Sequence, residues 1–258
     1  MSKRLSKHIN ALNAMKKYPV ELFYKGNLAL LDRPKVSIVG TRRPSTYTRQ
    51  FTYMLARSLA KRGVCIVSGA AMGVDTIAHT GAGEENTIAV MATGLDIRYP
   101  VLNRQMIETI EQKGLILSQF NDGFRATGWS FVVRNELVVA LGDILIVTEA
   151  DLNSGSMRSV EYALKMGKDI FVLSQRIDES LGTNMLLNEG KATVISDVEN
   201  FVSRFGEVGS EEMVKDDFFY FCQASPTFDA TVSKYGDRIY EAELEGLVTI
   251  HNGIVRLS

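Results

Sequence analysis

Two adjacent arginines follow directly after a short apolar run that has the character of a buried strand. The β-favouring run Val36–Val39 leads into Gly40 and Thr41, and Arg42 and Arg43 come next. In an open α/β sheet, ligands bind outside the carboxyl ends of the strands, where the following helix offers backbone N–H groups to an anion. Guanidinium forks match the geometry of a phosphate. The sequence therefore predicts a phosphate site for a nucleotide or a nucleic-acid backbone, with solvated arginines as the alternative.

Two further predicted strand-end loops carry small and hydroxyl-bearing residues. In Val67–Asp75, Gly69 would let the backbone approach a ligand and Ser68 offers a hydroxyl, although the glycine spacing does not match a dinucleotide fingerprint. Small residues in such a turn are more often structural. The second loop, Asn153–Ser156, offers hydroxyls, a capping residue and free N–H groups. We expect it to form a second anion site at the same edge of the sheet.

The segment Gly128–Asn135 combines aromatic and basic side chains, and we interpret it as a short loop before a helix. Aromatic faces near an arginine suit single-stranded nucleic acid, because stacking contributes about 1–3 kcal/mol per base and tolerates any sequence. Trp129 and Phe131 could equally be core residues. Arg98 and Arg104, which follow the third predicted strand, could either join a phosphate-binding rim or be solvated.

Residue types that perform catalysis or bind metals are not grouped in the sequence. The three histidines are scattered, and no GxSxG, Walker GxxxxGK[ST] or HExxH motif occurs. Asp75 and His79 have helical spacing, but such a pair is more often a surface contact. We therefore predict that the protein is not an enzyme and that it needs no metal and no cofactor.

The charge of the chain is strongly asymmetric, although the formal net charge is only -1. Residues 1–62 contain 14 Lys or Arg against two acidic residues, whereas residues 207–258 contain ten acidic residues against four basic ones. A basic N-terminal half favours binding to a polyanion. The acidic C-terminal segment argues against electrostatic binding of DNA by that segment. The sequence has no apolar run long enough for a membrane span, and Cys65 and Cys222 lack CxxC spacing. We expect a reduced, cytoplasmic protein.

Apolar, strand-like segments alternate with segments of helical periodicity, which indicates an α/β fold. The alternation predicts βαβ units in an extended Rossmann-like, doubly wound and mostly parallel sheet. Right-handed crossovers would place the strand-end loops on one rim. The predicted strands are 36–40, 64–69, 87–92, 114–119, 143–148, 169–173 and 192–195, and the predicted helices are 46–62, 74–82, 101–113, 134–141, 156–167 and 183–190.

The chain is predicted to contain two domains. A Rossmann-like domain covers 1–206 and includes a basic N-terminal segment, 1–17, and a small acidic module covers 207–258. Around 204–215 the sequence turns to glycine and acidic residues, which we interpret as a linker.

The small module carries the pattern of a helix followed by a hairpin. Tyr240, Leu244 and Leu247 have helical spacing, and Leu247–Leu257 has the pattern of a hairpin that turns at Asn252 and Gly253. This order is typical of the end of a winged helix, so we expect a winged-helix-like C-terminal module.

Taken together, the motifs resemble those of the DNA-processing protein A family, also called Smf, of natural transformation. The resemblance covers roughly residues 18–200 in order, and several co-linear motifs are more specific than any one of them. The matching pieces are Tyr18–Gly26, Gly40–Pro44, Ser68–Asp75, Gly94–Pro100, Phe131–Asn135 and Ser154–Ser156.

The resemblance implies a protein that binds single-stranded DNA of any sequence, and duplex DNA more weakly. It further implies protection of incoming DNA, a homodimer, and help in loading the RecA recombinase. Mapped onto this chain, Arg43 and Arg134 are the best candidates for DNA contacts, and Phe131 is a candidate stacking platform. The full set of candidate contacts is Gly40, Thr41, Arg42, Arg43, Ser68, Gly69, Arg104, Phe131, Arg134, Asn135, Ser154, Gly155 and Ser156.

Two features depart from the family pattern. Many members have an arginine where this chain has Glu136, and losing it weakens one possible DNA contact. Glu241, Glu243 and Glu245 lie on the helix of the tail, where a helix that reads DNA would be basic. We therefore predict that the tail serves protein contacts or stability.

Two alternative functions fit the same strand-end rim. The first is a nucleotide hydrolase resembling the cytokinin-activating phosphoribohydrolases, which carry PGGxGTxxE at the fifth-strand loop. The corresponding run here, Leu152–Ser159, has no paired glycines and ends in serine where the glutamate should be. The second alternative is a small-nucleotide sensor, for which saturable nucleotide binding would be the signature.

Overall fold

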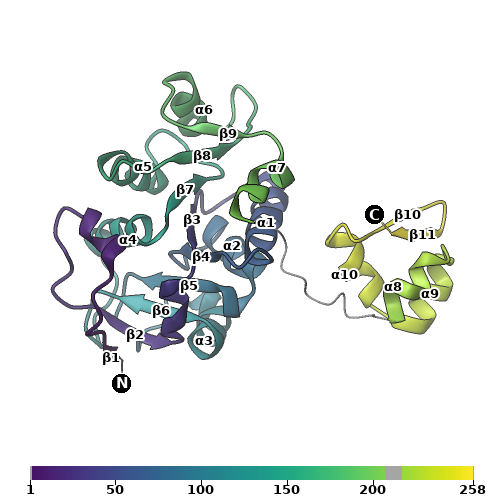
Figure 1. Cartoon of the computed structure of the whole chain (residues 1–258), viewed down its shortest axis with the longest axis horizontal. Coiled ribbons are helices and arrows are strands. Elements are labelled where there is room, and N and C mark those ends of the chain that lie inside the picture. The colour runs from purple at the N-terminus through teal and green to yellow at the C-terminus, as the bar shows by residue number, and fades with distance from the viewer. Residues whose placement is uncertain (1, 207–216, 258) are drawn as a thin grey trace. The chain divides into compact units, whose positions relative to one another are not determined.

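The computed structural model describes residues 2–206 and 217–257, and the chain divides into two compact units, Met1–Val208 and Gly209–Ser258 (Figure 1). Each unit is described by itself. Most of the predicted linker, 204–215, lies outside the described residues.

The larger unit is built on one nine-stranded sheet with the order β1-β2-β6-β5-β4-β3-β7-β8-β9 (Figure 1). The seven strands from β6 to β9 in that order pair in parallel, and β1 and β2 add two antiparallel strands at one edge. This arrangement confirms the doubly wound, mostly parallel fold. The strands are β1 (Lys3–Arg4), β2 (Phe23–Gly26), β3 (Lys35–Val39), β4 (Cys65–Ser68), β5 (Thr87–Met91), β6 (Leu115–Ser118), β7 (Ile144–Val147), β8 (Ile170–Leu173) and β9 (Thr193–Ile195).

Helices cover both faces of the sheet, because successive side chains of each strand point to opposite faces and both sets are apolar. One face packs on α4, α5 and α6, where Cys65 and Val67 of β4 are buried. The opposite face packs on α1, α2, α3 and α7, where Ile66 of the same strand is buried. The helices are α1 (Thr46–Ala60), α2 (Val74–Ala82), α3 (Arg104–Lys113), α4 (Gly128–Leu141), α5 (Gly155–Lys165), α6 (Leu181–Asn188) and α7 (Val198–Val202).

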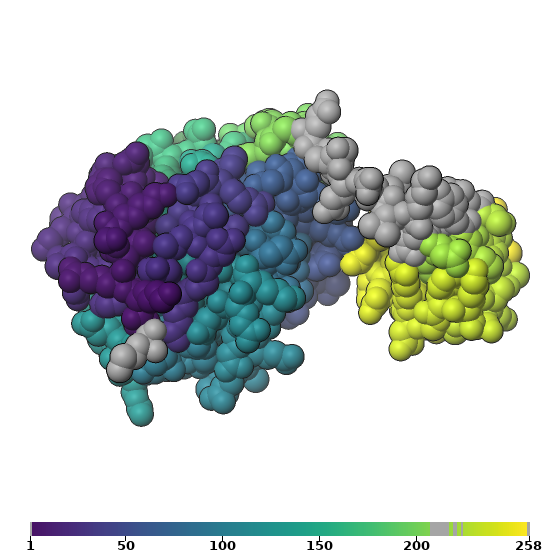
Figure 2. Space-filling view, turned by 60° about the horizontal axis from the view of Figure 1, so that its bottom comes forward, coloured from purple at the N-terminus to yellow at the C-terminus, as the bar shows by residue number. Residues whose placement is uncertain are grey.

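The basic N-terminal segment contributes apolar side chains to the core of this unit. Its short 3-10 helix, Asn10–Ala14, buries Leu12, and Ile9 and Met15 on either side are buried as well. The space-filling view shows this segment, in purple, packed against the rest of the unit (Figure 2).

The strand order reverses at β3, and the candidate site lies at this reversal. From β3 the chain moves outward through β4, β5 and β6 on one side, and later through β7, β8 and β9 on the other. The loops that leave β3 and β7 therefore diverge at the carboxyl edge of the sheet, where doubly wound folds bind their ligands. A backbone hydrogen bond from Thr41 to Glu149 O, 2.8 Å long, ties the two loops together at this point.

In the described residues of the smaller unit, 217–257, three helices are followed by a two-stranded hairpin, which is the predicted winged-helix-like order. Its core includes Phe218, Ile239, Val248 and Val255. The hairpin turns at Asn252 and Gly253, whose φ angles are 53° and 72°, as a two-residue turn with two left-handed positions requires. The elements are α8 (Asp217–Gln223), α9 (Phe228–Tyr235), α10 (Arg238–Leu244), β10 (Val248–His251) and β11 (Ile254–Leu257).

No helix among the described residues has the length and apolar character needed to cross a membrane.

Candidate nucleic-acid interface

The segment Gly128–Asn135 is the first half of helix α4, so its interpretation as a loop is wrong. Thr127 caps the helix: its hydroxyl accepts from the Ser130 N–H, and the Ser130 hydroxyl accepts from the Thr127 N–H. This reciprocal cap starts the helix six residues before the predicted start at residue 134. Phe131 and Arg134 are consequently one turn apart on the same helix face.

The ring of Phe131 lies at the centre of a cluster of cationic and aromatic groups. The guanidinium carbon of Arg42 is 5.6 Å from the ring centroid, and that of Arg134 is 5.8 Å away. The ring of Tyr99, half exposed, lies 5.9 Å from Phe131 at a tilt of 52°. These residues line a shallow depression together with Gly69 and other residues of the loops after β4 and β5. Tyr99 was given no functional role in the sequence analysis. Its position in a strand-end loop could have identified it as a site residue.

Arg134 forms the floor of this cluster rather than its surface. Only 5 % of the residue is exposed, and its Nη1 donates to the backbone oxygens of Gly69 and Val90, the latter at 2.9 Å. Burial lowers the pKa of the guanidinium, the nearby Asp75 carboxylate raises it, and Arg42 lowers it further. The arginine therefore fixes the loop after β4 and supplies positive charge from below the surface.

Gly69 is required by the close approach of Arg134. A Cβ at this position would lie 2.1 Å from Arg134 Nη1, which no side chain could tolerate without displacing the guanidinium. Gly40 has a comparable packing role, because a Cβ there would lie 2.6 Å from Val74 Cγ2 at the start of α2.

Ser68 does not reach the surface of the cluster. The residue is fully buried, and its hydroxyl donates to Ile38 O over 2.7 Å. The expectation that this hydroxyl contributes to the rim therefore does not fit its position, because the hydroxyl links β4 to β3 instead.

Asp75 and His79 are both buried, so their interpretation as a surface pair is wrong. The Asp75 carboxylate accepts from the N–H groups of Gly69 and Ala71 at 3.1 and 3.3 Å. Burial raises the pKa of Asp75, whereas Arg134 and the two backbone donors lower it. His79 Nδ1 lies 2.6 Å from Thr87 Oγ1, and burial lowers the pKa of His79 to about 3. His79 is therefore neutral at physiological pH.

The loop after β3 presents two exposed arginines, but the start of helix α1 already carries an internal anion. Arg42 and Arg43 are both exposed. The Glu149 carboxylate accepts from the N–H and the hydroxyl of Ser45, the N-cap residue, each over 3.0 Å. Phosphate recognition at this loop would rest on the guanidinium groups rather than on the N-terminus of α1. Thr41, the remaining candidate of the loop, accepts from the Arg43 N–H through its hydroxyl at 3.3 Å.

The candidate residues Ser154, Gly155 and Ser156 lie at the start of α5, beside α4. Helix α5 begins at Gly155. Asn135 joins the two helices, because its Nδ2 donates to Gly155 O over 3.3 Å and its Oδ1 accepts from Arg134 Nε over 3.1 Å. The Ser154 hydroxyl is buried and has no hydrogen-bond partner within the described part of the chain. This helix start therefore lies next to the Phe131 cluster with an unused hydroxyl.

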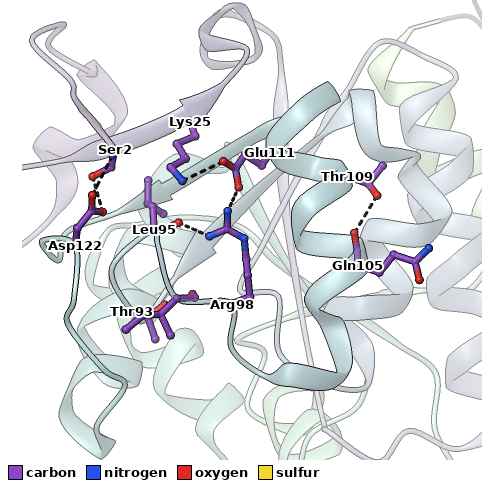
Figure 3. Close-up of polar contacts among 10 residues, drawn as sticks. Ser2, Lys25, Thr93, Leu95, Arg98, Gln105, Thr109, Glu111 and Asp122 are labelled. Carbon is purple, nitrogen blue, oxygen red and sulfur yellow. Dashed lines mark hydrogen bonds and ion pairs between the residues drawn. The ribbon is translucent and has the colours of Figure 1, made fainter.

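The two arginines after β5 have different environments. Arg98 is largely buried and pairs with Glu111, while its guanidinium also donates to Leu95 O (Figure 3). Lys25 approaches the other oxygen of the same carboxylate at 3.0 Å. Arg98 is thus neither solvated nor on the rim, and both alternatives for it are wrong. Arg104 is exposed at the start of α3.

The fold and the site define a class of protein: a doubly wound α/β domain whose strand-end face joins exposed arginines to an aromatic cluster. Within that class, the chain belongs to the DNA recombination-mediator protein A family, whose model matches residues 4–206.

Curated relatives and solved structures agree with this assignment. The DNA processing protein DprA of Streptococcus pneumoniae is 39% identical over 182 residues, which are 69% of this chain and 64% of that protein. Protein Smf of Synechocystis is 36% identical over 187 residues, 69% of this chain and 47% of the relative. The chain therefore spans about half to two thirds of these relatives. A structure from a study of the single-stranded DNA binding mode of DNA processing protein A from Helicobacter pylori is 45% identical, with a TM-score of 0.77 over 79% of this chain and 95% of that one.

Proposed function

We propose that this protein binds single-stranded DNA without sequence preference at the face formed by Arg42, Tyr99 and Phe131. The observation that carries the proposal is the placement of two guanidinium groups within 6 Å of the Phe131 ring centroid. Aromatic faces accept any unstacked base, and the exposed guanidinium of Arg42 can neutralise a neighbouring phosphate. We expect duplex DNA to bind more weakly, because its bases are stacked on one another and cannot reach the ring.

We further propose that the protein protects incoming DNA, helps to load the RecA recombinase during natural transformation, and acts as a homodimer in the cytoplasm. Membership of a recombination-mediator family supports the role beside a recombinase. Both cysteines are free and buried, which suits a reducing compartment. The role requires binding and release of DNA but no bond-breaking step, so we propose no catalysis. Within the described residues, no three His, Cys, Asp or Glu side chains form a group that could hold a metal ion.

Fluorescence anisotropy of a labelled single-stranded oligonucleotide, titrated at several salt concentrations, tests the DNA proposal. We expect saturable binding that weakens as salt rises, oligonucleotides of different sequence binding alike, and duplex competing poorly. If the wild-type protein does not bind single strands at low salt, the proposal is refuted. Saturable binding of mononucleotides in that case would favour the small-nucleotide sensor.

The recombinase role has its own test. RecA would be added to single strands already coated with a single-strand-binding protein, and its ATP hydrolysis would report filament formation. We expect this protein to shorten the lag before hydrolysis starts. An unchanged lag at saturating protein would contradict the loading role while leaving DNA binding untouched.

A further inference from the structure

A second cavity of about 590 Å³ opens on the same edge of the sheet, beside the exposed arginines of the β3 loop. Its size lies within the range of small-molecule sites. The cavity is formed by the start of α1 and by the loop after β8, on the side of β3 away from the Phe131 cluster. Its lining residues are Ser45, Tyr47, Ser174, Gln175, Arg176 and Glu179.

One wall of this cavity is an aromatic ring held in place from behind. Tyr47 is 41 % exposed, and its ring packs on that of Phe51, with centroids 4.6 Å apart and a tilt of 47°. The contact with Phe51 restrains the tyrosine ring while part of its surface remains open to solvent. An unstacked nucleobase could cover that open surface, since every base has a flat π-face.

The side of the cavity is formed by an amide with a fixed orientation. Gln175 Nε2 donates to Thr48 Oγ1 over 3.0 Å and to Thr148 O over 2.8 Å. Both amide hydrogens are therefore used, and Oε1 remains as an acceptor. The cavity thus combines an aromatic wall with an amide oxygen that can accept a hydrogen bond from the edge of a base or from a sugar hydroxyl.

The charges around the cavity favour a neutral group over a phosphate. Glu149 binds Ser45 on one side, and Glu179 lies on the other, 3.5 Å from Arg176. The carboxylates would repel a phosphate placed inside. The phosphates of a strand would instead lie at Arg43, two residues before Ser45 in the same loop.

We propose that this cavity holds one unstacked nucleobase of a single DNA strand, whose neighbouring phosphates contact Arg42 and Arg43. The proposal rests on the proposed single-stranded DNA binding, and it extends the path of the strand from the Phe131 cluster across the β3 loop to Tyr47. A free nucleoside offers the same chemistry, so the test must distinguish the two sources.

The test uses oligonucleotides that carry a single 2-aminopurine at successive positions, because stacking quenches its fluorescence. With wild-type protein we expect one position whose emission falls on binding through contact with Tyr47, and recovers in Tyr47→Ala. We also expect Tyr47→Ala to weaken binding of the oligonucleotide by about 5- to 150-fold, the range of one lost stacked base. Tyr240→Ala is the matched control, since Tyr240 is 45 % exposed in the C-terminal unit, and both effects should be absent in it.

Two results would overturn the proposal. If Tyr47→Ala matches wild type in both readouts while Arg42→Ala still weakens binding, the cavity holds no base and the proposed DNA-binding function stands. If free adenosine quenches the tyrosine emission of wild type but not of Tyr47→Ala, and the oligonucleotide does not compete, the ligand is a free nucleoside. Failure of wild type to bind any single strand would instead refute the proposed function itself.

Discussion

Replacing Arg134 by methionine removes the guanidinium from the floor of the Phe131 cluster while keeping an apolar chain of similar length. The change leaves the backbone oxygens of Gly69 and Val90 without their shared donor. A buried polar group without a partner costs about 1–3 kcal/mol, so two such groups lower the free energy of unfolding by about 2–6 kcal/mol. The buried Asp75 carboxylate also loses its favourable charge, so its pKa rises further.

Thermal unfolding followed by circular dichroism measures this cost. For a domain of this size, roughly 2–4 °C is lost per kcal/mol, so we expect the midpoint of Arg134→Met to fall by roughly 4–24 °C. Arg158→Met is the matched control: Arg158 is exposed and pairs with Glu161 at 3.0 Å, and its removal should change stability by less than about 1 kcal/mol. If Arg134→Met unfolds at the wild-type temperature, the guanidinium does not hold the two carbonyls and the reasoning fails.

Two further predictions concern the groups that support the cluster. Gly69→Ala should displace Arg134 and weaken single-stranded DNA binding measured by anisotropy. Gly155→Ala is the control and should leave the fold intact, because a Cβ at Gly155 meets nothing within 4 Å among the described residues. Equal stability of the two variants would contradict the close approach at Gly69. The folded-state pKa of His79, about 3, lies below its unfolded value of 6.5, so the unfolded chain binds the extra proton and stability falls as pH drops from about 6.5 towards 3. At pH 5 this loss is about 2 kcal/mol, and urea unfolding should show it reduced in His79→Asn; a variant with the wild-type pH dependence would refute the assignment.

The parallel strands β3 to β8 could be predicted from the sequence because they are largely buried on both faces and appear as mostly apolar runs. The edge strands β1 and β2 could not be predicted in this way. Both residues of Lys3–Arg4 are exposed, and Phe23–Gly26 is only half buried, so neither segment has the composition of a core strand.

The candidate site was only partly predictable for physical reasons of the same kind. The start of α4 was missed because its first turns carry apolar residues on the solvent side, with Trp129 64 % exposed and Val132 39 % exposed, which hides the helical periodicity. The hydroxyl of Ser68 could not be oriented from the sequence, because its acceptor, Ile38 O, belongs to a strand 30 residues away. The proximity of Arg42 and Phe131 was expected, since both follow strands whose carboxyl ends meet at one edge.

The most direct test of the central claim compares the affinity of single-stranded DNA for wild type, Phe131→Ala and Arg42→Ala across a range of salt concentrations. Lys61→Ala is the control, since Lys61 is an exposed cation at the C-terminal end of α1, the opposite end of that helix from the β3 loop. We predict that Phe131→Ala weakens binding by about 5- to 150-fold without changing the salt dependence. Arg42→Ala should lower the slope of log affinity against log salt by about 1, and Lys61→Ala should match wild type. If both site variants bind single strands as the control does, the DNA does not contact this face.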